Sequence, residues 1–429
     1  MNSMTREMKD SGIEWVGKIP VSWSIKKLNA FYSRKTIKNH PNERVLSVYR
    51  EYGVIPKDSR SDNHNVTSEN TSAYLLVQPT NLVVNKMKAW QGSMGISNHQ
   101  GIVSPAYFVY QETAVPRERR FFHYLLRSNI YAQEFRRLSR GMREGQWDLT
   151  AYDFERTPII VPPLLEQQQI ATFLDIKCSQ IDRLSDNIKQ QIEELGEYKK
   201  ALITQAITKG LDPDVEMKDS GIEWVGNIPQ KWEVSPLYVC FKERKNKNKE
   251  EQENNLLSLS YGKIVRKPID ILEGLLPESF STYNIVEKGD IIIRPTDLQN
   301  DKKSLRTGLV QEHGIITSAY IDLYLTGIGD VRYYHYLLHA FDEAKVFYNM
   351  GNGVRQGLNY STFSKLPILT PSLEDQSNIA DYLDSKCSLI DALVQTKNEK
   401  LDTLQDYKKS LVFDYVTGKK EVPADFRKE

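Results

Sequence analysis

The sequence predicts an α+β protein: two globular mixed α/β domains separated by two long antiparallel helices that form a coiled coil, with a pseudo-twofold internal repeat. Two observations support this prediction. The phrase "MKDSGIEWVGKIP" at positions 8–20 returns as "MKDSGIEWVGNIP" at 217–229 with one substitution. In addition, two stretches far apart in the chain share the seven-residue apolar spacing of helices that pack lengthwise on another helix.

The repeat runs through both halves of the chain. The offset of 209 residues between the two phrases also relates Ile170 to Ile379. Between these anchors the similarity weakens, and "RFFHYLL" (120–126) matches "RYYHYLL" (332–338) at an offset of 212. A period this long excludes a solenoid of short repeats. We therefore expect a duplicated pair of parts, each consisting of a variable domain followed by a fixed helix.

Four consecutive parts follow from this pattern: a first variable domain at 1–160, a central long helix at 161–210, a second variable domain at 211–369, and a C-terminal long helix with a tail at 370–429. Within the variable domains, short apolar runs bounded by turn residues predict strands. An amphipathic helix is expected at 117–140, between a proline and a glycine.

The two long helices carry the apolar stripe of a coiled coil. Because both connections lead out and back through similar domains, we expect the helices to run antiparallel, with Lys397 opposite Ile188. An amphipathic helix packed only on its own domain would show a similar pattern and remains the alternative. The predicted helix–helix interface consists of Leu174, Ile181, Leu184, Ile188, Leu195, Leu202, Leu383, Ile390, Leu393, Leu404 and Leu411.

Composition limits the class of protein. With 40% hydrophobic and 26% charged residues, the chain has an ordinary globular composition. Its three cysteines cannot form a complete set of disulfides, which favours a reducing, cytoplasmic setting. The N-terminal residues lack the apolar region of a signal peptide, and no apolar run is long enough to cross a membrane. The net charge of +1 leaves a polyanionic partner open, so local charge decides.

Local charge is strongly positive in both variable domains. The stretch 117–143 carries eight arginines and two glutamates, and 242–249, "KERKNKNK", carries five cations and one glutamate. Such clusters neutralise phosphates. A solvated basic surface without a ligand is the simpler explanation for either patch alone, but their occurrence in both halves favours a nucleic acid.

Polar loops in both halves could read bases, because Arg, Gln and Asn side chains make bidentate contacts with base edges. We expect Lys88 and Lys302 to contact phosphates, and Gln91 and Gln299 to contact bases. The candidates in the first half are Lys86, Lys88, Trp90, Gln91, Ser93, Arg140, Arg143 and Gln146. The candidates in the second half are Arg294, Thr296, Gln299, Lys302, Lys303, Arg306, Arg355, Gln356 and Asn359.

Catalytic and metal-binding patterns are weak. "HYLLH" places His335 and His339 one helical turn apart, but no third ligand is evident, so a structural role is favoured. "GNGVRQG" (351–357) lacks the lysine and the strand-to-helix context of a phosphate-binding loop. The chain is therefore predicted to bind without catalysing a reaction, with no catalytic residue and no metal site of its own.

The sequence resembles the specificity subunit of a type I restriction-modification system. The resemblance rests on "SGIEWVGKIP…SW" (11–23) and "SGIEWVGNIP…KW" (220–232), and on two later segments. These are "PIIVPPLLEQQQIATFLDIKCSQID" (158–182) and "PILTPSLEDQSNIADYLDSKCSLID" (367–391). Together they cover essentially the whole chain, and the double occurrence makes the resemblance specific.

The resemblance implies that each variable region is a target recognition domain for half of a split site in double-stranded DNA. The coiled coil would set the spacer between the half-sites and dock two modification (methyltransferase) subunits. S-adenosylmethionine would bind to the modification subunits, and ATP and Mg to restriction (translocase and endonuclease) subunits, with no cofactor on this chain. A flipped adenine would be held jointly with a modification subunit.

Two other functions compete with this interpretation. A coiled-coil scaffold whose domains bind proteins would show no preference for a DNA sequence. An autonomous nuclease would cleave DNA by itself in the presence of a metal ion.

Overall fold

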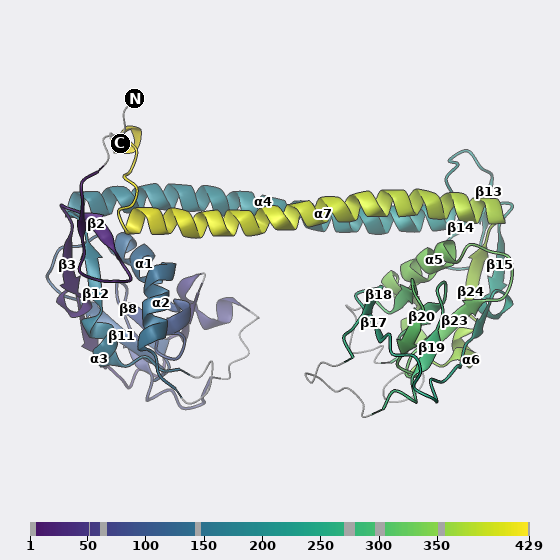
Figure 1. Cartoon of the computed structure of the whole chain (residues 1–429), viewed down its shortest axis with the longest axis horizontal. Helices are drawn as coiled ribbons and strands as arrows, with labels where there is room; N and C mark the ends of the chain where they lie inside the picture. Colours follow the sequence, from purple (N-terminus) through teal and green to yellow (C-terminus); the bar gives the residue numbers. More distant parts are fainter. Residues whose placement is uncertain are drawn as a thin grey trace. The chain divides into compact units, whose positions relative to one another are not determined.

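The computed structural model (Figure 1) describes residues 6–50, 52–60, 67–141, 147–269, 279–296, 305–350 and 357–427. The chain divides into two compact units. The first unit contains Met1–Ile188 and Glu399–Glu429, and the second contains Lys189–Asn398. Each long helix therefore contributes one half to each unit. In the described residues, the two units repeat the same strands in the same order, as the sequence predicts, and differ in their short helices.

The first unit is built on an antiparallel sheet of four strands, ordered β4-β11-β8-β9. Its strands are β4 (Tyr32–Lys35), β11 (Tyr107–Glu112), β8 (Leu82–Asn85) and β9 (Met94–Ile96). Four two-stranded pairs surround this sheet. They are β1 (Met8–Asp10) with β2 (Lys18–Pro20), β3 (Ser24–Lys27) with β12 (Pro158–Val161), β5 (Leu46–Tyr49) with β6 (Gly53–Pro56), and β7 (Leu75–Val77) with β10 (Gly101–Val103).

Three short helices accompany this sheet: α1 (Arg119–Arg127), α2 (Asn129–Leu138) and α3 (Ala151–Arg156). The apolar faces of α1 and α2 supply much of the core, including the fully buried Phe121 and Phe135. The single helix expected at 117–140 is thus two helices, and that prediction was wrong. Ser128, between them, has extended backbone angles and donates from Oγ to the carbonyl of Leu125, so it ends α1 and starts α2.

The second unit repeats the plan with the sheet order β16-β23-β20-β21. Its strands are β16 (Phe241–Glu243), β23 (Ile321–Leu325), β20 (Ile291–Ile293) and β21 (Thr307–Leu309). The surrounding pairs are β13 (Met217–Asp219) with β14 (Asn227–Pro229), β15 (Glu233–Pro236) with β24 (Pro367–Thr370), β17 (Leu257–Ser260) with β18 (Lys263–Arg266), and β19 (Asn284–Val286) with β22 (Gly314–Ile316). The helices are α5 (Val331–Glu343) and α6 (Tyr360–Phe363).

Short 3-10 turns join these elements. They are Leu28–Ala30, Lys57–Ser59, Ala89–Gln91, Leu237–Val239, Val346–Asn349 and Ala424–Arg427.

The repeated phrase forms the same hairpin twice, and each copy receives the end of a long helix. In the first unit, the chain after α7 turns at Gly418, where an added Cβ would lie 2.6 Å from Pro20. In the second unit, the chain after α4 turns at Gly210, where a Cβ would lie 3.4 Å from Trp232. Both glycines have positive φ. The repeated phrase thus occurs twice because each unit has one such hairpin, which packs against the end of one long helix.

The long helices α4 (Leu164–Lys209) and α7 (Leu373–Val416) pack antiparallel within each unit. In the first unit, Asp182 Oδ1 of α4 lies 2.6 Å from Lys408 Nζ of α7. In the second unit, Lys199 Nζ lies 2.6 Å from Asp391 Oδ1. Residues further along α4 thus pair with residues earlier in α7, which confirms that the two helices run antiparallel. The helices in Figure 1 follow this course (α4 teal, α7 yellow-green).

Most of the predicted interface residues are buried or half-buried, with two exceptions. Leu184 and Leu393 are exposed, so they were wrongly placed in the interface. In a pair of helices only one narrow stripe of each faces the other, and these leucines lie outside it. Lys397 donates to Gln191 Oε1 at 2.6 Å, so its partner is not the predicted Ile188. The residues that are buried or half-buried are Leu174, Ile181, Ile188, Leu195, Leu202, Leu383, Ile390, Leu404 and Leu411.

Candidate nucleic-acid interface

In the first unit, the loop after β8 is compact and carries several of the predicted contact residues. Trp90 donates from Nε1 to the carbonyl of Met87 at 3.1 Å. Lys88 is exposed and Gln91 is half-buried, so both side chains reach the surface. Ser93 is buried at the end of the loop, where its carbonyl accepts from Asn85 N at 3.0 Å. Ser93 is therefore part of the loop base, and the prediction of a surface contact is wrong for it.

A second segment joins this loop and brings further predicted residues to it. Arg140 and Asp148 exchange two backbone hydrogen bonds, of 3.1 and 2.9 Å. Lys86 Nζ lies 3.9 Å from Asp148 Oδ2, and the rings of Trp90 and Trp147 meet edge to face at 5.2 Å. The fold thus brings Arg140, fifty residues further along the chain, into one surface region with Lys86 and Trp90. Arg143 and Gln146 lie outside the described residues.

The corresponding loop of the second unit is anchored by a buried arginine. Arg306 is fully buried and donates from Nη1 to the carbonyl of Thr296 at 2.5 Å. Its backbone N–H bonds to the carboxylate of Asp342. Arg306 therefore holds the base of the loop, and the prediction that it contacts DNA is wrong for this buried side chain. Gln299, Lys302 and Lys303 lie outside the described residues.

Asn359 also has a structural role. Its Oδ1 accepts from the backbone N–H of Thr362 at 2.9 Å, which caps α6. This bond uses the amide oxygen that base reading would need. The neighbouring predicted residues Arg355 and Gln356 lie outside the described residues.

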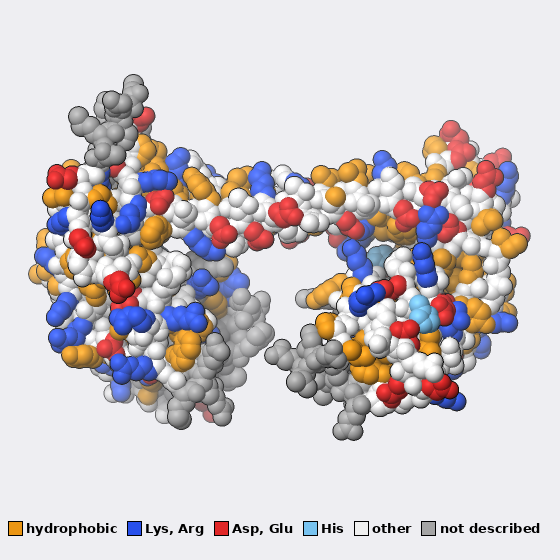
Figure 2. Space-filling model, in the orientation of Figure 1, with side chains coloured by type: hydrophobic (Ala, Val, Ile, Leu, Met, Phe, Trp, Pro, Cys, Tyr) orange, Lys and Arg blue, Asp and Glu red, His pale blue; other side chains and the backbone are white. Residues whose placement is uncertain are grey.

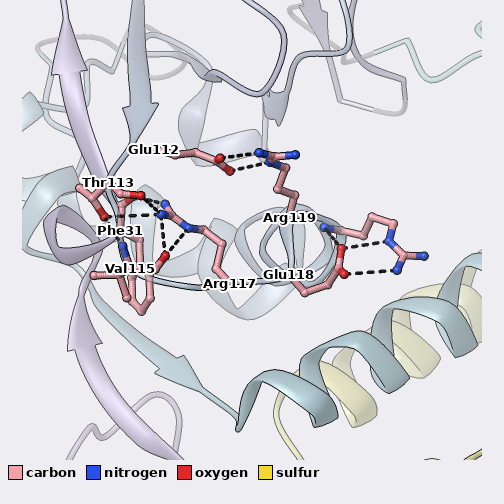
Figure 3. A network of polar contacts seen from close by, with 8 residues as sticks. Phe31, Glu112, Thr113, Val115, Arg117, Glu118 and Arg119 are labelled. Carbon is pink, nitrogen blue, oxygen red and sulfur yellow. Dashed lines mark hydrogen bonds and ion pairs between the residues drawn. The ribbon is translucent and has the colours of Figure 1, made fainter.

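Several arginines of the stretch 117–143 are bonded within the fold, and the ion pairs involve Arg119, Arg120 and Arg137. Arg117 donates to the backbone carbonyls of Phe31, Thr113 and Val115, and Arg119 forms two bonds with Glu112 at 2.8 and 2.9 Å (Figure 3). Figure 2 shows Lys and Arg interspersed with Asp and Glu on the visible face of the domain. Part of the local charge that favoured a nucleic acid is therefore paired with carboxylates of the same domain and of α4.

One group of these contacts joins the first domain to α4. Arg120 donates to Asp175 Oδ2 and Tyr124 to Asp175 Oδ1, both at 2.8 Å. The side chain of Gln167 accepts from the backbone N–H of Glu118 at 2.9 Å and donates to the carbonyl of Pro162. We call Gln167, Asp175, Arg120 and Tyr124 the first clamp. Burial raises the pKa of the Tyr124 phenol, so it remains a donor.

The second unit has an equivalent clamp, formed by Gln376, Asp384, Arg332 and Tyr336. Arg332 and Tyr336 bond to Asp384 at 2.9 and 2.8 Å. Gln376 accepts from the N–H of Asp330 at 2.9 Å. Our sequence interpretation missed the clamps. Their signal was present, since Arg and Tyr recur within "RFFHYLL" and "RYYHYLL" and the Gln and Asp recur on the long helices at the offset of 209.

The long helices also expose equivalent apolar side chains in both units. Leu184 and Tyr407 are 43% and 56% exposed in the first unit, and Leu393 and Tyr198 are 44% and 57% exposed in the second. The ion pair of Asp182 with Lys408 sets Leu184 and Tyr407 at about the same level along their helices. The same two positions are thus exposed in both units, since Leu184 and Leu393, and Tyr198 and Tyr407, are related by the offset of 209.

The second unit differs in holding a buried pair of carboxylates. Asp322 on β23 is buried beside Asp290, and Arg244 binds Asp290 at 2.8 and 3.0 Å. Burial, and next the neighbouring Asp290 charge, raise the pKa of Asp322 to about 8. In the first unit, the positions of Asp290 and Asp322 are taken by Asn81 and Val109.

Among the residues that the structure describes, no group of three or more His, Cys, Asp or Glu side chains could hold a metal ion. Within the same described ranges, no helix is long and apolar enough to cross a membrane. His335 and His339 lie with ring centroids 6.2 Å apart on α5, and burial lowers the pKa of both.

Comparison with known proteins identifies the family. The model of the type I restriction modification DNA specificity domain matches residues 31–194 and 325–403, together more than half of the chain. The chain belongs to this family. A relative, the type I restriction enzyme MjaVIII specificity subunit of Methanocaldococcus jannaschii, is 28% identical over 281 residues. That match covers 62% of this chain and 63% of the relative. The chain therefore spans less than two thirds of the length of this relative.

Two solved structures resemble the specificity-family chain. One, from work on complex assembly and conformational transition of the type I R-M system, has a TM-score of 0.67 at 13% identity. The superposition covers 93% of this chain and 98% of the other, which supports the fold. The other, the HsdS subunit from Thermoanaerobacter tengcongensis, has a TM-score of 0.49 at 13% identity over the same shares.

Proposed function

We propose that this chain is the DNA sequence-specificity subunit of a type I restriction-modification complex, in a cytoplasmic setting. Each globular domain binds one half of a bipartite DNA target, and the paired helices set the spacer between the halves. The observation that carries the proposal is the duplication of a whole domain together with its clamp to a long helix. Two domains with different loops, each held to a long helix by an equivalent clamp, suit a target with two different half-sites.

In the first domain, the loop after β8 is the proposed DNA contact. Lys88 is exposed and contacts a phosphate, so Lys88→Ala weakens binding to all sequences alike. Gln91 reaches a base edge, so Gln91→Ala relaxes one position of the site by about 1–3 kcal/mol if the contact is bidentate. An equal loss on every sequence for the Gln91 variant would assign it to the phosphate backbone.

The helices act as a spacer because each clamp fixes a domain to the start of a helix. The ion pairs between α4 and α7 lie at matching levels in the two units, where Lys408 contacts Asp182 and Lys199 contacts Asp391. A change in helix length therefore shifts a clamp along the helix axis by about 1.5 Å per residue.

The exposed Leu184 with Tyr407, and Leu393 with Tyr198, are the proposed docking sites of two modification subunits. Two equivalent sites on one chain fit two copies of one partner. These subunits would bring S-adenosylmethionine, and restriction subunits would bring ATP and Mg. The chain itself supplies recognition and no catalytic group.

The test removes one heptad from both helices at the same level, residues 187–193 and 396–402. The register is kept, and the clamps approach by about 10 Å, roughly three base pairs. Single-molecule sequencing of DNA methylation in cells with the intact or shortened chain measures the target. We expect unchanged half-sites with a shorter spacer, or loss of methylation. Methylation of the original site with its original spacer would contradict the spacer proposal.

A gel shift with genomic fragments, with and without modification subunits, separates this function from a protein scaffold, which would show no preference for a DNA sequence. Cleavage by the purified chain alone with a metal ion would instead indicate a nuclease.

A further inference from the structure

Each domain carries one two-stranded hairpin outside its main sheet, and the two hairpins share a tyrosine followed by a glycine. The first hairpin is β5–β6 and the second is β17–β18. Tyr52-Gly53 and Tyr261-Gly262 are related by the offset of 209, although the surrounding sequences have diverged and the first turn is longer. Both glycines have positive φ. Each hairpin thus has a tyrosine followed by a glycine of positive φ at its turn. Gly53 is already the first residue of β6 and pairs with Tyr49, whereas Gly262 lies in the turn before Lys263.

The hairpins are seated firmly on their domains. Gly308 on β21 lies so close to the second hairpin that an added Cβ would be 2.6 Å from Leu259 and 2.9 Å from Ile264. Gly95 occupies the equivalent place on β9, where a Cβ would lie 3.2 Å from the Cα of Gly53. In both domains the sheet omits a side chain so that the hairpin can approach. The turns are therefore held in fixed positions.

The tyrosines at these turns face solvent. Tyr52 is 53% exposed and Tyr261 is 86% exposed. Tyr261 also has φ +48, and Gly262 has φ +77, which is the pattern of a two-residue turn that favours Asn-Gly. A tyrosine at positive φ is strained, and an exposed ring recovers little by packing within its own fold. A strained, exposed aromatic side chain at a rigid turn points to an external ligand.

Cations lie beside the first ring and along the second hairpin. The guanidinium of Arg60 lies 4.6 Å from the centroid of Tyr52. The second hairpin and its continuation to Pro268 carry Lys263, Arg266 and Lys267 and no acidic residue. Arg266 pairs with Glu312 and Lys263 Nζ lies 3.8 Å from Asp391 Oδ2, whereas Lys267 is exposed. Aromatic rings that stack on bases, next to cations that meet phosphates, are the usual composition of a surface that binds unstacked bases. A two-stranded ribbon is also an element that fits a DNA groove.

We propose that Tyr52 and Tyr261 are duplex-entering residues: each ring stacks on a nucleobase that leaves the helical stack within the half-site bound by its own domain. Arg60 beside Tyr52, and the exposed Lys267 that follows the second hairpin, hold the adjacent phosphates. This rests on the proposed DNA recognition and adds the hairpins as a contact separate from the loops after β8 and β20. The ligand group is a base of any identity, because every base offers a ring face for stacking.

The test uses the full chain assembled with its modification subunits and DNA that contains the methylated site. The variants are Tyr52→Ala, Tyr261→Ala and Tyr261→Phe, with Tyr238→Ala as the control, because Tyr238 is similarly exposed (54%) but lies away from the hairpin. We expect each hairpin alanine variant to weaken binding about 5- to 150-fold. Phenylalanine should keep most of the affinity, and the control should bind as the unaltered chain does.

A base analogue locates the contact. With 2-aminopurine placed through each half-site in turn, the unaltered assembly should change the fluorescence near both turns. Tyr261→Ala should remove the change in one half-site only, and Tyr52→Ala in the other. Unchanged affinity and fluorescence in both alanine variants, with site-specific binding by the unaltered chain, would overturn this inference and leave the proposed function standing. Failure of the unaltered chain to bind any site would overturn both.

Strain provides a second variant that does not depend on loss of stability. Tyr261→Asn suits the positive φ, so it should raise the melting temperature while DNA binding falls as in Tyr261→Ala. If the asparagine variant binds DNA normally, the ring is not a contact. If the alanine variants lose modification subunits while keeping DNA, the hairpins bind protein and the inference is wrong.

Discussion

The two units share the clamp that holds each domain to a long helix, but they differ in the loops of the domains. In both, a glutamine and an aspartate of a long helix hold the first helix after the sheet, with bond lengths that agree within about 0.1 Å. The loop between the third and fourth strands of each sheet starts from an equivalent backbone hydrogen bond. In the first unit this bond joins Asn85 to Ser93, and in the second it joins Arg294 to Arg306.

The difference lies in what fills the loop base. The first loop is short and closes over the small Ser93, whereas the second is longer and closes over the buried Arg306. The second sheet also buries Asp322, where the first has Val109. The comparison teaches that contacts between domain and helix are kept, while the domain interior changes with its loop. A duplicated recognition protein can thus change the loops of one domain while the contacts between that domain and the long helix stay the same.

The largest expected effect breaks the second loop base. Arg306→Ala removes a buried cation and leaves the Asp342 carboxylate, whose pKa burial already raises to about 6, with less compensating charge. We expect the second unit to lose about 3–5 kcal/mol of unfolding free energy. Hydrogen exchange of β20 and β23 measures this directly. Ser93→Ala in the first unit is the matched control and should cost less than about 0.5 kcal/mol, because the bonds of Ser93 at the loop base come from its backbone. Equal losses would show that the two loop bases do not differ.

The next effect is a pH dependence confined to the second unit. The folded-state pKa of Asp322, about 8, lies above its unfolded value near 3.8, so the folded state holds a proton that the unfolded state has released. The stability of the second unit should therefore fall as pH rises from about 4 to about 8 and then level off. Asp342, with a pKa of about 6, adds a smaller decline between about pH 4 and 6. Asp322→Asn should therefore remove the decline between about pH 6 and 8 and leave the part that is due to Asp342.

Val109 at the equivalent place cannot titrate, so hydrogen exchange of β8 and β11 in the first unit should lack this contribution. A decline of equal size in both units, or one between about pH 6 and 8 that survives in Asp322→Asn, would remove Asp322 as its cause.

The smallest effect tests whether the clamps are equivalent. Gln167→Ala and Gln376→Ala each remove a buried amide that accepts from one backbone N–H and donates to one carbonyl. Gln376 also donates to the Tyr334 hydroxyl at 3.3 Å. Each substitution should cost about 1–3 kcal/mol, and the two costs should agree within about 1 kcal/mol. Urea unfolding followed by hydrogen exchange in α1 and α5 gives both values. A clearly larger cost in one unit would show that the clamps contribute unequally.

The sequence alone determined the repeat, the two long antiparallel helices and the two mixed α/β domains. These features depend on spacing within single segments: a phrase repeated at a constant offset, and apolar residues every seven positions. Such patterns survive whatever the segments pack against, and the quoted motifs were enough to suggest the family before any coordinates.

Only the tertiary structure decided which polar residues are available at the surface. Arg120 looks like a free cation in sequence, yet it meets Asp175, 55 residues away. Arg306 and Ser93 look like loop residues but close the loops from beneath, and Leu184 fits the heptad yet remains exposed. The reason is physical: burial and charge neutralisation are set by partners distant in the chain. The same long-range packing fixes the tyrosines of the two hairpins at their exposed turns, because each hairpin rests on a strand glycine more than forty residues further along the chain.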